Sequence, residues 1–265
     1  MPELPEVEIF NRYLDRTSLH RRINAVDVRS PYVLKGISAR ELARRLKGRR
    51  FESSRRHGKH LFVHAGDELW LRLHFGMTGS LHYFKNEEHA PSHVRVVFVF
   101  DGNHRLAFDD QRQFGQVSLL GDIDEFLKEH ALGPDALDPN LEDFRKILTK
   151  HHGAVKPALL NQRLIAGIGN IYADEILFRT RIHPATEISR LGDKALVELF
   201  RATHYILEKA IAARADANRM PKSWLLQRRG KTEDCPRCGG KLKSASIGGR
   251  TTWFCPNCQK RPSNG

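Results

Sequence analysis

The chain has 265 residues, 40% of them hydrophobic, and a formal net charge of +13. This length and hydrophobic content exclude a disordered chain and favour two domains, or two domains with a small appendage. Because no stretch approaches the roughly 20 apolar residues of a membrane span and no secretory signal stands at the N-terminus, we expect a cytoplasmic protein with no membrane partner.

The first predicted element is a short helix at the N-terminus. After Pro5, the apolar residues Val7, Phe10 and Leu14 recur at steps of three and four, which is the spacing of one helix face. Pro5 suits the first turn because the N–H that proline lacks would be unpaired there. An ordered element therefore begins almost at the first residue, where most chains have a loose tail.

Two β-hairpins are predicted next. Residues 61–64 and 69–75 flank a Gly-Asp turn, and residues 93–100 and 105–108 flank an Asp-Gly turn. In 69–75 one face carries Leu69, Leu71, Leu73 and Phe75 and the other carries Trp70, Arg72 and His74. Several strands joined by tight turns indicate an antiparallel sandwich or barrel.

Helices dominate the second half of the chain. Glycine and proline in residues 133–140 indicate a linker. Beyond it, the expected helices are 141–148, 154–161, 172–178 and 194–213, with turns at 167–170 and 183–184.

Four cysteines stand near the C-terminus, in the order Cys235-x2-Cys238, sixteen residues, Cys255-x2-Cys258. This spacing is typical of a four-thiolate zinc site. A disulfide framework is the alternative, and it would be unusual in an intracellular enzyme of this size. We expect one structural Zn²⁺, because four thiolates complete the tetrahedron and leave no open position for catalysis.

Positive charge is concentrated in the same segment. Residues 220–265 contain ten Lys or Arg against two acidic residues, so they carry +8 of the net +13. A basic surface kept for solubility is the plain alternative. The clustering favours a polyanionic partner, of which nucleic acid is the commonest.

Four stretches now stand in order: MPELPEVE, LRLHFGMTGS, NQRLIAGIGNIYADEILF and the paired CxxC motifs. In this combination the chain resembles the formamidopyrimidine-DNA glycosylases, the Fpg/Nei family of bifunctional DNA glycosylases. The resemblance implies an α+β multidomain fold. Its expected parts are an N-terminal antiparallel β-sandwich with flanking helices (1–133), a helical helix–two-turn–helix domain (140–230) and a C-terminal zinc β-hairpin (231–265).

Chemistry at the N-terminus agrees with this resemblance. Once Met1 is removed, Pro2 presents an α-amino group with a pKa of about 8, against about 10.4 for a lysine. Its attack on a sugar C1′ would give an iminium, whose fixed positive charge allows elimination of the 3′ and then the 5′ phosphate. Glu3 could protonate the ring oxygen. Taken alone, Pro2 would be a stiff lead-in, and Glu3 and Glu6 would be helix N-terminal acids.

The resemblance also implies a set of DNA contacts. Lys59 and Arg250 match phosphate-binding residues of the catalytic machinery, and Glu6 matches a glutamate near the damaged base. The other matching positions are His74, Met77, Arg112, Phe114, Lys156, Asn170 and Arg228. Arg228 stands where family members have a tyrosine.

Physical arguments support several of these positions. Asn170 opens a helix after a glycine-rich turn, where backbone N–H groups favour a phosphate. Arg250 would lie at the tip of the zinc hairpin. Phe114 can wedge beside a base, Met77 can fill an irregular gap, and Arg112 can hydrogen-bond the orphaned base.

Each contact has a plainer alternative. For Met77 and Phe114 it is an ordinary core position, and for Asn170 a helix cap. For His74 it is a structural sheet histidine. Lys59 and Lys156 could be solvated lysines, of a basic loop and of a helix start respectively.

The pattern also departs from the family. Gln111 and Gln113 replace a proline and a second arginine, and the stretch 213–235 is shorter than in purine-specialised members, where a longer loop covers an everted 8-oxoguanine. We therefore expect broad activity on ring-opened purines, with hydantoins and oxidised pyrimidines as further substrates and 8-oxoguanine as a weaker one.

The predicted function is thus base-excision repair, in which the enzyme removes oxidised or ring-opened bases and cleaves the abasic strand by β,δ-elimination through an N-terminal proline Schiff base. The expected partner is double-stranded DNA with damaged bases or abasic sites, bound by a monomer in a bacterial-type, nucleoid-associated setting. One alternative is a non-catalytic binder of damaged DNA on the same scaffold, which intact Pro2 and Glu3 disfavour. Another is an RNA- or ribosome-bound zinc-ribbon protein, which leaves the N-terminus unexplained.

Overall fold

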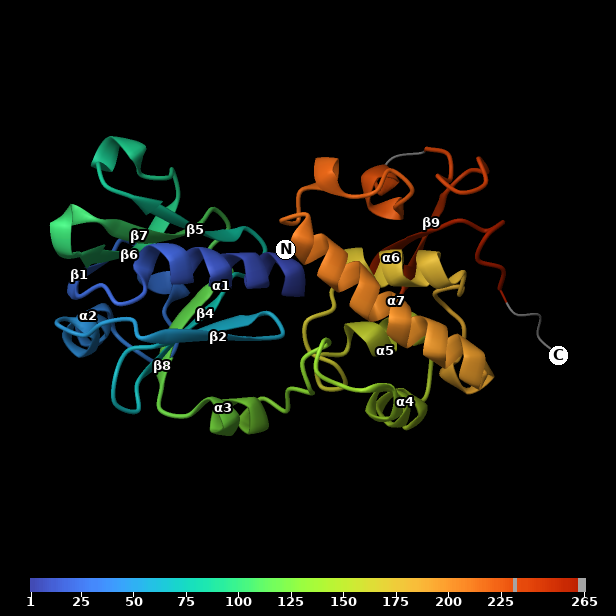
Figure 1. Ribbon diagram of the computed structural model, residues 1–265, viewed down its shortest axis with the longest axis horizontal. Helices are drawn as coiled ribbons and strands as arrows, with labels where there is room; N and C mark the ends of the chain where they lie inside the picture. Colours follow the sequence, from blue (N-terminus) through green and yellow to red (C-terminus); the bar gives the residue numbers. More distant parts are fainter. Residues whose placement is uncertain (231–232, 262–265) are drawn as a thin grey trace. The chain divides into compact units, whose positions relative to one another are not determined.

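The computed structural model describes residues 1–230 and 233–261. The chain forms two compact units (Figure 1): residues 1–2 and 6–131 make the first, and residues 3–5 with the chain from 132 onward make the second. Residues 3–5 thus belong with the second unit although they begin the first helix. The division into three domains stays a prediction.

The first unit contains two four-stranded antiparallel sheets with three α-helices. Its elements are α1 (Leu4–Ser18), β1 (Ile23–Val28), η1 (Pro31–Val33), α2 (Ala39–Leu46), β2 (Ser53–His57), β3 (His60–His64), β4 (Trp70–His74), β5 (Gly79–Phe84), η2 (Glu87–His89), β6 (Val94–Phe100), η3 (Asp101–Asn103), β7 (Arg105–Asp110), β8 (Gln116–Leu120) and α3 (Ile123–Glu129). The strand orders are β1-β6-β7-β5 and β2-β3-β4-β8. Both predicted hairpins, β3–β4 and β6–β7, are confirmed and form the centre of each sheet.

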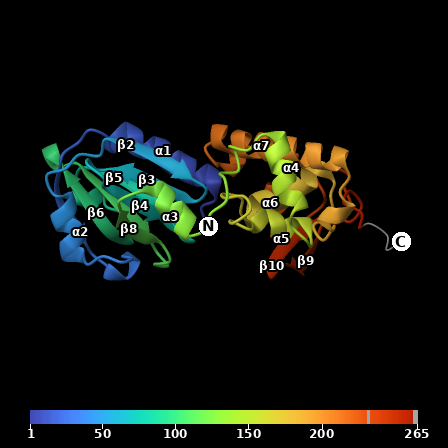
Figure 2. The same ribbon diagram turned by 90° about the horizontal axis from the view of Figure 1, so that it is seen from below.

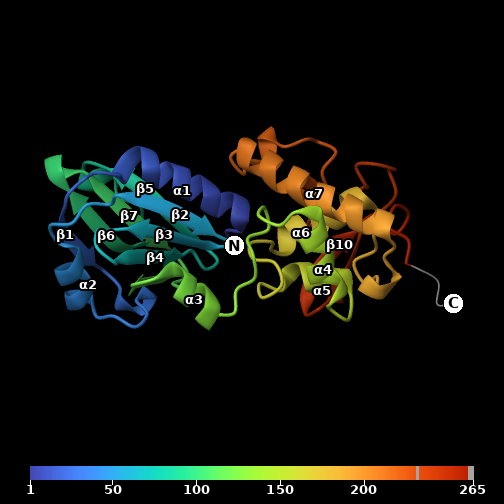
Figure 3. The same ribbon diagram turned by 60° about the horizontal axis from the view of Figure 1, so that its bottom comes forward.

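The core of this unit lies between the two sheets and under α1. Leu61, Leu71 and Leu73 from one sheet and Phe98 and Phe108 from the other are buried in one cluster. Alternation places these side chains on the inner faces. Helix α1 runs beside β2 (Figure 3), where Ser54 donates hydrogen bonds to Asn11 and Asp15. The predicted sandwich with flanking helices is confirmed.

The outer face of the β3–β4 hairpin is covered by α3. The Phe126 ring packs edge-on to His60 and Phe62 and lies 4.8 Å from the Arg72 guanidinium carbon. Arg72, expected on the polar face, is therefore buried, and it donates to Gln116, Ser118 and His60.

The second unit is helical with a small ribbon. Its elements are α4 (Leu141–Thr149), α5 (Val155–Leu160), α6 (Asn170–Thr180), η4 (Ile188–Arg190), α7 (Asp193–Ala212), η5 (Ala217–Arg219), η6 (Leu225–Arg228), β9 (Lys243–Ile247) and β10 (Arg250–Phe254). The four predicted helices are confirmed, with α6 beginning two residues early because Gly169 is its N-cap. Among the described residues, no helix is long and apolar enough to cross a membrane.

Helix α6 lies at the centre of this unit, between α7 and β10 (Figure 2). Every residue from Tyr172 to Phe178 is buried, including Asp174 and Glu175. A helix surrounded by protein can keep acidic side chains only when partners compensate the charge. The partners of these two residues define much of the site.

Candidate functional site

The Glu3 carboxylate sits on the N-terminus of α6. It is 2% exposed and accepts hydrogen bonds from the backbone N–H groups of Gly169 (2.9 Å), Ile171 (2.8 Å) and Tyr172 (3.2 Å). The first turn of a helix leaves these N–H groups unpaired and carries partial positive charge. A carboxylate satisfies both, so Glu3 holds residues 3–5 against α6 within the second unit.

Two glycines make room for this segment. A Cβ on Gly169 would collide with the Glu3 carboxyl group, and a Cβ on Gly167 would lie 2.6 Å from Cδ1 of Leu4. The Leu4 N–H also donates to the Gly167 carbonyl. The GIGN motif therefore leaves the space that Glu3 and Leu4 occupy. The expectation that the backbone N–H groups of this turn bind a phosphate is wrong for Gly169, Ile171 and Tyr172, because Glu3 occupies them.

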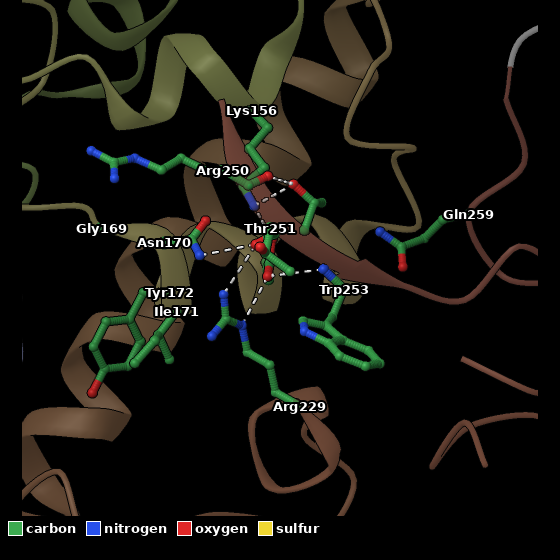
Figure 4. Close-up of polar contacts among 12 residues, drawn as sticks. Lys156, Gly169, Asn170, Ile171, Tyr172, Arg229, Arg250, Thr251, Trp253 and Gln259 are labelled. Atoms are coloured by element: carbon green, nitrogen blue, oxygen red, sulfur yellow. Dashed lines mark hydrogen bonds and ion pairs between the residues drawn. The ribbon is translucent and has the colours of Figure 1, made fainter. Parts of the chain in front are cut away.

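Lys156 is buried rather than solvated, and Figure 4 draws it with its polar contacts. Its side chain is 0% exposed, and Nζ lies 2.6 Å from Oδ1 of Asp174, which is 1% exposed. Nζ also donates to Oγ1 of Thr252 at 2.7 Å. Burial lowers the pKa of Lys156, and the attraction of Asp174 opposes that shift. The alternative of a solvated helix-start lysine is wrong, and a direct DNA contact by Lys156 stays a prediction.

The second oxygen of Asp174 binds two further groups. Oδ2 accepts from Nε of Arg229 at 2.9 Å and from the backbone N–H of Trp253 at 3.1 Å. Arg229 and Asn170 both donate to the Thr251 carbonyl, at 3.3 and 3.0 Å. Asn170 is thus the first residue of α6 and fastens β10, so the helix-cap alternative is wrong. Its DNA contact stays a prediction.

Arg250 and Arg228 differ in their surroundings. Arg250 is the first residue of β10, exposed, and follows a turn in which Gly248 and Gly249 have positive φ. It pairs with Ile247 at the hairpin end, which is the expected tip position. Arg228, which stands where family members have a tyrosine, forms an ion pair with Glu233 at 2.7 Å. DNA contacts by both arginines stay predictions.

The four cysteines form a metal-binding cluster. Their sulfurs all lie within 4.8 Å of one another, with 3.9 Å between Cys235 and Cys258 and 3.6 Å between Cys238 and Cys255. Zn–S bonds of about 2.3 Å in a tetrahedron place sulfurs about 3.8 Å apart. The four residues therefore fit one structural zinc ion, as predicted.

In the first unit, Met77 and Phe114 project from neighbouring loops. Their side chains are 37% and 54% exposed, so the alternative of ordinary core residues is wrong for both. The Arg112 guanidinium lies 4.9 Å from the Phe114 ring centre. Arg112 and Phe114 are thus in contact, and exposed Met77 stands between Gly76 and Thr78, which contact the loop that carries both residues.

A buried carboxylate ties the two loops. Asp110 accepts from Thr78 at 2.5 Å and from the Gly115 N–H at 2.7 Å, while Thr78 accepts from the Arg112 N–H. Gln113 has a φ of 56° and accepts from the Ser30 hydroxyl. The glutamine that departs from the family pattern thus has a local partner.

His74 and Lys59 lie on the sheet that contains β3 and β4. Burial lowers the pKa of His74 to about 4, with smaller contributions from Arg72 and Lys59. Its Nδ1 accepts from the Gly76 N–H, so the neutral ring carries its proton on Nε2 and can donate from there. Lys59 stands in the two-residue turn between β2 and β3, after Gly58 with a φ of 54°.

The remaining candidates are at the N-terminus. Pro2 is half-buried, and Glu6 lies in the first turn of α1. Sequence reasoning missed Asp110, Asp174, Arg229 and Thr252. An acidic residue in an otherwise apolar helix, as in IYADEILF, was the available signal for Asp174. Asp110 stands in a polar run at the end of β7 and Thr252 is the middle residue of β10, and neither position offers such a signal.

Three family models match the chain. The formamidopyrimidine-DNA glycosylase N-terminal domain matches residues 1–117, and the formamidopyrimidine-DNA glycosylase H2TH domain matches residues 132–221. A zinc finger found in FPG and IleRS matches residues 233–261. The matches include the N-terminal segment, the glycine-rich turn before α6 and the cysteine cluster.

Relatives match along nearly the whole chain. A formamidopyrimidine-DNA glycosylase of Pelotomaculum thermopropionicum is 33% identical, over 98% of this chain and 99% of that protein, and one of Listeria innocua is 35% identical, over 98% and 100%. A solved complex of Lactococcus lactis Fpg with DNA containing an abasic site has a TM-score of 0.88 and 29% identity, over 98% of this chain and 100% of that one. A structure of MutM with DNA containing carbocyclic 8-oxo-G has a TM-score of 0.86 and 29% identity, with the same coverage.

Proposed function

The chain belongs to the formamidopyrimidine-DNA glycosylase family, and we propose that it excises ring-opened and oxidised bases from double-stranded DNA and then cleaves the abasic strand through Pro2. Members of this family are DNA glycosylases with AP lyase activity, so the chain is a base-excision-repair enzyme. The seat of Glu3 on α6 is the observation that carries the Pro2 mechanism, because it holds the residue next to the nucleophile in one place.

The proposed reaction uses the first two residues of the processed chain. The neutral Pro2 nitrogen attacks C1′ and the base departs, and the proton that the attacking nitrogen loses passes to the base. The sugar ring then opens, its oxygen takes a proton, and a cationic iminium forms. Loss of a C2′ proton expels the 3′ phosphate, a second elimination expels the 5′ phosphate, and water releases the sugar fragment and restores the amine. The positive iminium nitrogen accepts the electron pair at each elimination.

Glu3 would supply the proton that opens the ring. Three N–H donors stabilise its carboxylate form, so the proton must first be taken up. The Pro2 ammonium, adjacent in the chain, can provide it. One transfer then yields a nucleophilic amine and a carboxylic acid together, which is what the first step requires.

We assign the DNA contacts unit by unit. In the first unit Lys59 and His74 bind phosphates, Met77, Arg112 and Phe114 occupy the space left by the flipped nucleotide, and Glu6 lies near the damaged base. In the second unit Asn170, Arg228 and Arg250 bind phosphates. The proposal also retains three domains (1–133, 140–230 and 231–265) and a monomer acting in the bacterial cytoplasm at the nucleoid.

The short stretch after α7 supports the proposed substrate range. Trp224 is buried, the Leu226 N–H donates to Glu175, and the Gln227 amide donates to the carbonyls of Ala217 and Met220. These contacts hold the segment against its own unit, which disfavours a role as a long cover over an everted base. Single-turnover cleavage of duplexes with defined lesions tests this, and a large preference for 8-oxoguanine would contradict it.

Reductive trapping tests the mechanism. Borohydride added during reaction with abasic-site DNA should reduce the iminium to a stable amine and leave a covalent adduct that maps to Pro2. Folded protein that binds this DNA but gives no adduct would favour the non-catalytic binder.

A further inference from the structure

A buried charge cluster underlies the strand that begins with Arg250. We propose that Lys156 and Asp174 are positioning residues that hold β10, and with it the Arg250 side chain, in the phosphate-binding orientation, and that neither contacts DNA. The inference rests on the phosphate-binding role proposed for Arg250. It gives Lys156 a different role from the one that the family resemblance implies.

Burial separates Lys156 from any ligand. Its side chain is 0% exposed, and its ammonium group already contacts Asp174 and Thr252. A phosphate could reach it only if β10 moved away, which would break both contacts. Opening a buried ion pair leaves an uncompensated charge and is strongly unfavourable.

One route from Lys156 reaches Arg250 through a hydrogen-bond chain. Nζ of Lys156 donates to Oγ1 of Thr252, and Oγ1 donates to the carbonyl of Arg250 at 3.0 Å. The Thr252 hydroxyl is thereby used as both acceptor and donor. The carbonyl orientation of Arg250 is thus coupled to a cation on α5.

A second route passes through Asp174. Its Oδ2 accepts from the Trp253 N–H and from Arg229, and Arg229 donates to the Thr251 carbonyl. Groups on four consecutive residues, from Arg250 to Trp253, are therefore fixed directly or indirectly by one ion pair (Figure 4).

The β9–β10 hairpin needs an anchor at its tip, where Arg250 begins β10. The zinc ligands hold the opposite end, beginning at Cys255, whereas the tip contains Gly248 and Gly249 at φ 59° and 70°. Glycines give a turn little stiffness. A long arginine binds a phosphate with precision only if its backbone is held, and the ion pair supplies that support.

The test is a set of double-mutant cycles on duplex containing a stable abasic-site analogue. Lys156→Met and Asp174→Asn are each combined with Arg250→Ala, and Kd is measured against salt concentration. Loss of the Arg250 contact should reduce the slope of log K against log salt by about 0.9. If the two residues position Arg250, Lys156→Met and Asp174→Asn should each reduce the slope by nearly as much as Arg250→Ala does. Combining either of them with Arg250→Ala should then raise Kd less than twofold above that of Arg250→Ala alone.

The sign of the Asp174 effect distinguishes the two roles. If Lys156 contacted a phosphate, neutralising the nearby carboxylate would tighten binding or leave it unchanged, because a repulsive charge is removed. Positioning predicts that Asp174→Asn weakens binding, as Lys156→Met does. Lys146→Met and Glu142→Gln are the matched controls, because that exposed ion pair lies on α4 of the same unit; neither should change the slope.

Thr252 provides a test that keeps the ion pair intact. Thr252→Val removes the hydroxyl that links Lys156 to Arg250 and should weaken binding, whereas Thr252→Ser should restore it. Zinc content should remain one per chain in all of these variants. If the cluster served stability alone, the variants would lower thermal stability, but DNA affinity would not be lost in Thr252→Val and restored in Thr252→Ser.

The outcomes separate the inference from the function. If Arg250→Ala leaves Kd unchanged, the proposed role of Arg250 is wrong and the inference falls with it, while trapping at Pro2 still decides the enzyme mechanism. If Arg250→Ala weakens binding, the inference alone is overturned by additive losses with Lys156→Met or by tighter binding of Asp174→Asn.

Discussion

Substitution of Gly169 by alanine should detach the Glu3 carboxylate from α6. Gly169 has φ −123° and ψ −168°, an extended conformation that alanine adopts without strain. The new methyl group would lie 2.5 Å from Cγ of Glu3 and closer still to its carboxyl group. The acid must therefore move, and the effect of the substitution is steric displacement rather than backbone strain.

The expected magnitude follows from three lost hydrogen bonds. A bond to a charged group contributes about 1.5–3 kcal/mol, and loss of an N-cap acceptor costs about 0.5–2 kcal/mol. Because water can replace part of the interaction, we expect a loss of about 2–4 kcal/mol in the free energy of unfolding of the second unit. Displacing a general acid should slow base excision by roughly 10²–10⁴-fold.

Gly192→Ala is the matched control. Gly192 is the N-cap of α7, also extended at φ −69° and ψ 167°, and an added Cβ there would meet nothing within 4 Å. The assays are thermal unfolding and single-turnover excision of a ring-opened purine, with cleavage of a preformed abasic site measured in parallel. Equal melting temperatures and excision rates for the two variants would refute the role assigned to the seat of Glu3.

Four further outcomes are expected. An N-terminal tag or retained Met1 should abolish strand cleavage and leave the Kd for abasic-site DNA unchanged; cleavage by the tagged protein would exclude Pro2 as nucleophile. Removal of zinc by a chelator should unfold the ribbon and weaken DNA binding, monitored by zinc release and Kd; unchanged binding would contradict a structural zinc. Gly76→Ala would place a Cβ against the Phe114–Gly115 backbone. This variant should excise the base more slowly than the parent protein even after correction for the fraction of unfolded protein, and an excision rate equal to that of the parent would contradict the wedge. Because burial lowers the pKa of His74 to about 4, the unfolded state binds more protons between about pH 6.5 and 4, and stability should fall by up to about 3 kcal/mol as pH drops through that window. Urea unfolding at several pH values measures this, and His74→Gln should flatten the profile.

The strands that could be predicted are the central ones. β3, β4, β6 and β7 are apolar runs bounded by turn residues, and they occupy the inner positions of the two sheets. The edge strands β1, β2, β5 and β8 were not predicted. An edge strand such as SSRRH in β2 has neighbours on one side only and one solvated face, so its composition is not distinct from that of a loop.

Site residues divide in a similar way. The sequence by itself determined the zinc ligands, because their spacing reflects one tetrahedral ion, and it determined the family motifs and the helices α1 and α4 to α7, but not α2 or α3. Only the tertiary structure decided that Glu3 rather than a phosphate occupies the N–H groups at the start of α6, and that Lys156 is buried. Both facts depend on residues far apart in the chain: Glu3 is 166 positions from Gly169, and Lys156 is 96 positions from Thr252. The local sequence shows which residues can carry a charge, whereas tertiary packing decides which partner lies close enough to compensate that charge.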